Sequence, residues 1–198
     1  TAVPNTGYSF TGWTDNVSSA TRTETNVTAS KSVAATCTAL PIGTLDVSPT
    51  SCTIADNAST CPVSISWKVT NPIPGASTAV TKDNPAGTTV STAPSGTNVS
   101  NAINHGTTNF WLYHNSVSLA GQKTATAKCA SGSDYISGFC RAKLTITATQ
   151  APNCTITPSG ITNVVYGSDQ LYIITPANGY NVSSLIIDGF TITGATSK

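Results

Sequence analysis

Charge is scarce in this chain of 198 residues, since Lys, Arg, Asp and Glu together make up 9% of it and the formal net charge is +1. A nucleic-acid-binding protein is expected to carry a basic stripe, and binding to an anionic membrane surface needs a polybasic patch. The sequence has neither. Methionine is absent as well. Because a natural chain begins with Met, we expect a processed product or a segment of something longer.

Long apolar runs and helical periodicity are also missing. No stretch of 18 apolar residues is present, so this segment is not expected to insert into a membrane. Thr, Ser, Asn and Val dominate instead, together with 15 Gly and 11 Pro. β-branched residues favour strands, while Gly, Pro, Asn and Ser favour turns. The composition therefore predicts an all-β fold.

Residues that carry chemistry are few. The chain has two histidines, His105 and His114, and one glutamate, Glu24. It contains neither a Gly-x-Ser-x-Gly elbow nor a His-Glu-x-x-His zinc pair, and it has no phosphate-cradling glycine loop. Its aspartates never occur as Asp-x-Asp, whereas calcium sites need several carboxylates. We expect no catalytic residue, no cofactor and no metal; turnover abolished by changing either histidine would contradict this.

Six cysteines, an even number without metal-type spacing, indicate an oxidising, extracellular environment. Two pairs bracket short segments with turn residues at their centres, at Asp56-Asn57 and at Asp134-Tyr135, so each pair is expected to lie across a hairpin. The remaining two cysteines would tie the ends of the middle region together. The predicted bridges are Cys52–Cys61, Cys129–Cys140 and Cys37–Cys154. A Cys61–Cys129 bridge between two sheets is the alternative.

One phrase, Pro-x-x-Gly-Tyr, occurs near both ends, as PNTGYSF at residues 4–10 and as PANGYNV at residues 176–182. An apolar, strand-like run follows each copy. Repeats of this kind indicate a modular array. The residues of the phrase that we single out are Pro4, Gly7, Tyr8 and Trp13 in the first copy and Pro176, Gly179 and Tyr180 in the second.

The first copy resembles the internalin-type B-repeat, a small extracellular bacterial module whose phrase ends with a Lys-x-Val-x-Ala strand. The matching residues are Pro4, Gly7, Tyr8, Phe10, Gly12, Trp13, Lys31, Val33 and Ala35. The second copy has the strand LYIIT before the phrase and an Asp188-Gly189 hairpin signal after it. The resemblance implies a bacterial surface or fibre protein with two partial modules. The first would lack its opening strand, and the second, which stops at TGATSK, its closing one.

The middle region differs from both tips. The stretch SISWKVTNP puts Ile65 and Trp67 on one face of a strand, by the alternation typical of half-buried strands. TTNFWLYHNSVSLAG and RAKLTITATQ read as further strands. An inward Trp followed by a Thr-Asn step resembles bacterial Ig-like domains, which implies a β-sandwich. The predicted domains are 1–37, a partial B-repeat-like module; 38–154, an Ig-like sandwich; and 155–198, a second partial module.

An aromatic cluster in NFWLYHN is the candidate ligand or interface surface. Alternation puts Phe110 and Leu112 on one face of the strand and Trp111 and Tyr113 on the other. One pair must serve the core, and the other is available to a ligand or a neighbouring domain, because aromatic residues are enriched at interfaces. Packing within the domain is the competing interpretation for both pairs.

These observations predict a structural segment of a secreted or surface-displayed fibre, stalk or adhesin, with β domains stacked head to tail. The expected partners are copies of the chain or adjoining domains of one long chain, because open sheet edges invite strand addition. The alternative is an adhesin module that recognises glycan or protein through Phe110, Trp111 and Tyr113. Nucleic acid is not an expected partner.

Overall fold

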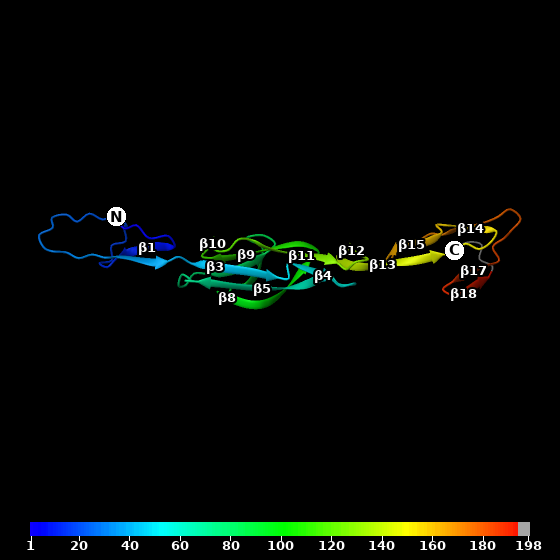
Figure 1. Cartoon of the computed structure of the whole chain (residues 1–198), viewed down its shortest axis with the longest axis horizontal. Coiled ribbons are helices and arrows are strands. Elements are labelled where there is room, and N and C mark those ends of the chain that lie inside the picture. The colour runs from blue at the N-terminus through cyan, green and yellow to red at the C-terminus, as the bar shows by residue number, and fades with distance from the viewer. Residues whose placement is uncertain (194–198) are drawn as a thin grey trace. The chain divides into compact units, whose positions relative to one another are not determined.

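The computed structural model describes residues 1–193, and these residues form strands and turns without any helix. The all-β prediction is therefore confirmed, and no helix able to span a membrane occurs in the described part of the chain. The chain divides into two compact units (Figure 1). The first unit comprises Thr1–Cys52 and Thr60–Lys128; the second comprises Thr53–Ser59 and the chain from Cys129 onward. The three predicted domains remain a prediction.

The first unit begins with a small sheet in which β1 (Tyr8–Trp13) pairs with β2 (Ala35–Ala39) in antiparallel fashion. The sequence predicted a closing strand that included Lys31 and Val33, but the strand begins only at Ala35. The segment between the two strands forms turns and bends instead. Side-chain contacts around Trp13, described below, hold part of this segment.

Two larger antiparallel sheets follow in the first unit. The order in the three-stranded sheet is β3 (Ile42–Ser48), β5 (Thr60–Thr70), β8 (Ser95–Asn104). The order in the six-stranded sheet is β4 (Ser51–Ile54), β11 (Lys123–Cys129), β9 (Gly106–His114), β6 (Thr78–Lys82), β7 (Thr88–Ser91), and the short β10 (Val117–Ser118) also pairs with β9.

β5 lies at the centre of the three-stranded sheet and has one buried face. Every second residue from Cys61 to Val69 is buried, and Ile65 and Trp67 lie on this buried face as the sequence predicted. Trp67 also donates a hydrogen bond from Nε1 to the carbonyl oxygen of Ala93, at 2.9 Å. Its polar atom is therefore satisfied although its ring is buried.

The core of the first unit lies between these two sheets. A Cβ atom on Gly43 of β3 would come within 2.7 Å of Leu112 Cδ2 of β9, so the sheets approach each other closely. Lys82 of β6 also donates to Asn101 Oδ1 of β8, at 3.2 Å. Burying each large apolar side chain stabilises the fold by roughly 1.5–3 kcal/mol. The main contributors are Leu45, Val47, Val63, Ile65, Trp67, Val69, Val80, Ile103, Phe110 and Leu112.

The second unit consists of three small antiparallel sheets. The first has the order β12 (Ser133–Ile136), β13 (Phe139–Ala148), β15 (Gly160–Val165). The other two are the pairs β14 (Cys154–Thr157) with β16 (Ile173–Pro176) and β17 (Ser184–Ile187) with β18 (Phe190–Thr193). The TGATSK end that was predicted to stop short lies mostly outside the described residues.

Two sequence signals in this unit are confirmed. The apolar run LYIIT contributes β16, although pairing starts only at Ile173. Asp188 and Gly189 form the two-residue loop between β17 and β18, with φ of 49° and 82°. Positive φ at both positions is what a type I′ hairpin turn requires.

The second unit buries little apolar surface. Its buried hydrophobic residues among those described are Ile54, Cys140 and Val164. In contrast, Ile161, Ile186 and Phe190 are 73%, 67% and 77% exposed. Small sheets with few buried side chains are marginally stable on their own. The second unit therefore depends on other stabilising interactions.

We predict that Gly96→Ala destabilises the first unit by about 1–3 kcal/mol, the usual cost of overpacking a core. A Cβ atom at Gly96 would lie 2.3–2.6 Å from three carbons of the Trp67 ring. Urea unfolding followed by tryptophan fluorescence measures the loss. Gly121→Ala is the matched control, because a Cβ there meets nothing within 4 Å. Equal stability of the two variants would contradict the prediction.

Candidate functional site

The repeated phrase folds into the same turn in both copies. In the first, Tyr8 N–H donates to the carbonyl oxygen of Asn5 at 3.0 Å, and Gly7 has φ of 84°. In the second, Tyr180 N–H donates to Ala177 O, also at 3.0 Å, and the φ of Gly179 is again 84°. Positive φ at the third position of a four-residue turn favours glycine. This explains why the phrase keeps Gly immediately before Tyr.

The two copies differ after the turn. Tyr8 opens β1 at once, whereas three residues that are not in a strand separate Tyr180 from Ser184, the first residue of β17. Pro176 ends β16 and pairs with Cys154, while Pro4 precedes the turn outside any strand. The two tips therefore share a local turn and present different strands around it.

Trp13 is the centre of the first module. Its ring meets Phe10 edge to face, with ring centroids 5.8 Å apart, and its Nε1 donates to Ser19 O at 2.8 Å. The Arg22 guanidinium lies over the same ring, 5.1 Å from the centroid. Arg22 also forms a bidentate pair with Asp15, at 2.9 and 3.0 Å, and contacts Glu24. These contacts bind the first half of the 14–34 segment to β1.

The charged side chains of this cluster shift one another's pKa values. The hydrogen bond from Arg22 lowers the pKa of Asp15. Hydrogen bonds from Lys31 and then from Arg22 lower the pKa of Glu24, and the Asp15 carboxylate raises the pKa of Arg22. All three groups therefore stay charged at neutral pH. The cluster is an ion-pair network that holds a loop, and it offers no free acid or base for catalysis.

Two of the predicted disulfides are confirmed, Cys52–Cys61 and Cys129–Cys140. The Cys61–Cys129 alternative is thereby wrong. The third predicted bridge needs correction, because Cys37 and Cys154 are free thiols in the structure. Cys37 lies in the β1–β2 sheet of the first unit and Cys154 in the β14–β16 sheet of the second. Each is already placed by the backbone pairing of its own small sheet.

The confirmed pairs do not lie where hairpins were expected. Cys52 belongs to β4 of the six-stranded sheet and Cys61 to β5 of the three-stranded sheet, so their bridge joins two sheets. Cys140 has Tyr135, not Cys129, as its ladder partner in the β12–β13 hairpin. That hairpin turns at Ser137-Gly138, with φ of 50° and 87°, and not at Asp134-Tyr135.

The segment 53–59, which the Cys52–Cys61 bridge closes, has its own partners in the second unit. Asn57 N–H donates to Cys140 O at 2.7 Å, and Cys140 N–H donates to Ala58 O at 2.8 Å. The Asp56 carboxylate accepts from Ala142 N–H at 2.5 Å. The Arg141 guanidinium contacts Asn57 and also lies 5.1 Å from the centroids of the Phe139 and Tyr166 rings.

The aromatic cluster divides between the two faces of β9 as alternation predicted. Phe110 and Leu112 are fully buried in the core, so Phe110 must be removed from the candidate ligand surface. Trp111 and Tyr113 lie half-buried on the opposite face. Their ladder partners on β6 are Thr81 and Ala79. Only these two aromatic residues of the cluster remain available for contact with a ligand or neighbour.

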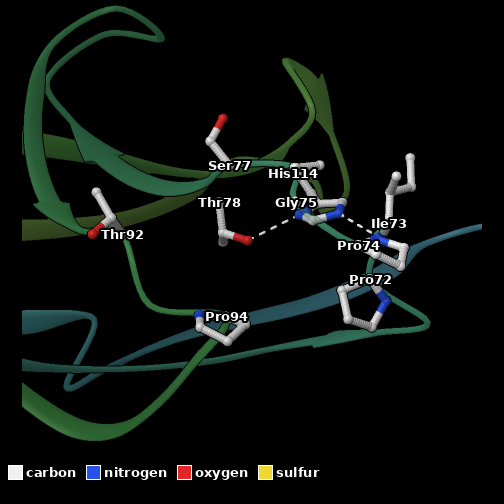
Figure 2. A pocket seen from close by; sticks show the side chains of 10 residues that line it. Pro72, Ile73, Pro74, Gly75, Ser77, Thr78, Thr92, Pro94 and His114 are labelled. Carbon is white, nitrogen blue, oxygen red and sulfur yellow. Dashed lines mark hydrogen bonds between the residues drawn. The ribbon is translucent and has the colours of Figure 1, made fainter.

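A pocket of 360 Å³ lies in the first unit, lined by residues 72–77, Thr78, Thr92, Pro94 and His114 (Figure 2). His114 and Thr78 are buried polar residues in its lining; His114 is hydrogen-bonded to Thr78 and to the backbone of Ile73. Sequence reasoning did not find this pocket, because the proline-rich loop and the end of β9 are about 40 residues apart in the chain. The sequence signal that was available is the Pro-Ile-Pro-Gly run itself.

Both histidines lie in the first unit. Both ring nitrogens of His114 are occupied, and His105 lies in the turn between β8 and β9. Across residues 1–193, no three His, Cys, Asp or Glu side chains gather closely enough to hold a metal ion. That the protein is not an enzyme stays a prediction.

Comparison with known proteins bears on the first module. A family model described as the divergent InlB B-repeat domain matches residues 1–41. The expected B-repeat resemblance of the first copy is thereby confirmed, over slightly more residues than the predicted 1–37. Searches of curated proteins and of solved structures found no match. A B-repeat domain and two disulfides together are typical of an extracellular β-domain protein.

We expect that the double substitution Cys52→Ser with Cys61→Ser lowers stability by about 2–5 kcal/mol, as loss of a native bridge in a small secreted domain does. Removing the bridge frees the ends of segment 53–59 and unties two sheets. Thermal unfolding under non-reducing conditions measures the change. Cys37→Ser is the control, because this exposed thiol has no partner cysteine. Similar melting temperatures for both variants would contradict the role of the bridge.

The ion-pair network makes a second prediction. Arg22→Gln should raise the pKa of both Asp15 and Glu24 toward ordinary values, because Arg22 lowers both in the native protein. Since both native pKa values are lowered, any stabilisation by the network is present at neutral pH and lost as the pH falls through them. Carboxyl ¹³C NMR titration measures both values. Lys143→Gln, which removes the pair with Asp134, should leave them unchanged.

Proposed function

We propose that this chain is a structural segment of an extracellular bacterial fibre, stalk or adhesin, in which β domains stack head to tail. The observation that carries this proposal is the exposed apolar surface of the second unit. Its three small sheets have open edges and bury little, and apolar residues of β15, β17 and β18 face solvent. Such surfaces are covered in functional proteins, usually by another protein surface.

Several other features support a structural role. The first unit has two sheets with inward-facing apolar residues between them, as an Ig-like sandwich does. Disulfides tie segments that the small sheets hold weakly. The scarcity of charge gives no field that would steer nucleic acid or an anionic membrane. An Ig-like middle domain with a B-repeat on one side fits the domain organisation of a modular surface protein.

The partner in this proposal is a copy of the chain or an adjoining domain of the same long chain. The first module presents β1–β2, a two-stranded sheet with open edges. The second unit presents β14–β16 and β17–β18, which are also two-stranded. Strand addition would complete these sheets with backbone hydrogen bonds. Because head and tail differ, such a contact does not close on itself and produces an open filament.

The alternative is an adhesin module that binds glycan or protein. Trp111 and Tyr113 favour it, because they lie half-buried on the outer face of β9 and outside the core. The substitution Trp111→Ala separates the two functions. Ligand capture lost with unchanged unfolding favours the adhesin, whereas lost stability or assembly with no ligand favours the structural segment.

Assembly itself is tested with the whole 198-residue chain. We expect its mass by light scattering to rise with concentration, and a synthetic strand of residues 26–39 carrying Cys37→Ser to bind. This strand contains β2, and binding should slow hydrogen exchange in β14–β18. A peptide with the same composition in scrambled order is the control.

A matched pair of variants locates the contact. Phe190→Asp should abolish the rise in mass while leaving the isolated fold intact, because Phe190 is 77% exposed on β18. Val117→Asp, at a 60% exposed residue of the first unit, should leave assembly unchanged. A chain that remains monomeric at millimolar concentration and ignores the strand would rule out self-assembly by strand addition.

A further inference from the structure

His114 is the last residue of β9 and is only 2% exposed. Its Nε2 accepts a hydrogen bond from the backbone N–H of Ile73 at 2.9 Å, and its Nδ1 lies 2.9 Å from Thr78 Oγ1. Figure 2 shows both contacts, which reach in opposite directions from the ring. A backbone N–H can only donate, so Nε2 carries no proton. The ring is therefore neutral, with its proton on Nδ1, which donates to Thr78.

The loop that Ile73 belongs to has few backbone donors of its own. Pro72 and Pro74 have no N–H, so Ile73 supplies the single backbone donor of residues 72–74. That donor goes to His114. The loop is anchored again at Ser77, whose carbonyl oxygen accepts from Asn115 N–H at 2.9 Å. Between Thr70 and Ser77, the His114 bond is thus the contact that ties this proline-rich stretch to β9.

Protonation of His114 would break this contact. The added proton on Nε2 would point at the Ile73 N–H, setting two donors against each other. The ring would also become a buried cation, which is costly without a partner. Its hydrogen-bond partners Ile73 and Thr78 and its ladder partner Val117 from β10 lie beside it, residues 72–77, Thr92 and Pro94 line the same pocket, and none of these is titratable or charged. Nothing in this set of neighbours can compensate the charge.

We propose that His114 is a proton-operated latch that holds the loop 71–77 at this end of the first unit. The neutral ring keeps the loop closed, and the charged ring releases it. Histidine is the side chain that ordinarily changes charge between pH 5 and 8. The loop is therefore held above the pH at which His114 gains its proton and released below it. Release separates the loop from β9 and changes the shape of the 360 Å³ pocket that Ile73, Pro94 and His114 line.

The test is an NMR titration of the full chain labelled with ¹⁵N. At neutral pH the His114 ring should show the Nδ1–H tautomer, and the Ile73 amide should exchange slowly with solvent. Below the titration midpoint, the held fraction should fall about tenfold for each pH unit. We expect the exchange protection of Ile73 to fall with it, reversibly, while the protection of Val63 and Ile65 in β5 stays unchanged.

Two variants identify the group responsible. In His114→Gln, the side-chain amide oxygen can accept from Ile73 N–H but does not titrate, so Ile73 should stay protected at acidic pH. His105→Gln removes the other histidine and should behave like the native chain. The proposal is overturned if native Ile73 keeps its protection after the ring has gained its proton, if the ring stays neutral until β5 itself unfolds, or if the ring shows the Nε2–H tautomer at neutral pH. The tautomer is read from the native chain, so this measurement stands even if His114→Gln fails to fold.

Discussion

The burial of apolar side chains between the two larger sheets is the interaction on which the rest of this chain depends. β5 supplies five alternating buried residues to it, and β9 supplies Phe110 and Leu112 from the facing sheet. With roughly 1.5–3 kcal/mol from each large side chain, this core outweighs any other single contribution. Neither the β1–β2 module nor the small sheets of the second unit bury a comparable set of residues.

Where few apolar side chains are buried, hydrogen bonds, aromatic contacts and a disulfide hold the chain instead. In the first module, Trp13 donates a hydrogen bond to a backbone carbonyl and its ring contacts the Phe10 ring and the Arg22 guanidinium. In the second unit, the Cys129–Cys140 bridge and the hydrogen bonds of segment 53–59 hold the start of β13. A disulfide limits the unfolded chain and needs no buried surface. This suits modules whose apolar faces are left for a neighbour to cover, as the proposed head-to-tail assembly requires.

The His114 latch is a polar contact of the first unit that lies at the end of a strand. A buried histidine with both nitrogens bonded costs little while it is neutral, and its bond to Ile73 satisfies a backbone donor. The same arrangement makes the loop sensitive to acid. Stability at neutral pH and release at low pH thus come from one side chain. The latch acts within the first unit and does not depend on whether the chain assembles.

The amino-acid sequence by itself determined the features that depend on neighbouring residues. These are the all-β class, the inward face of β5, the division of the NFWLYHN aromatics, the Asp188-Gly189 turn and the first-module resemblance. They follow from composition, from a residue motif, from side-chain alternation or from backbone conformations that few residues adopt. Two cysteine pairs were also correct, because short separations of 9 and 11 residues make local closure favourable.

Only the tertiary structure decided the features that join distant residues. Cys52 and Cys61 were expected across a hairpin but belong to two sheets, because strand pairing depends on the faces that must be buried and not on the turn between them. The predicted Cys37–Cys154 bridge is wrong, since the backbone of separate small sheets places each thiol. The contact of His114 with Ile73, 41 residues away, has no sequence signature. It arises because β6 pairs with β9, which places His114 beside the proline-containing loop that leads into β6.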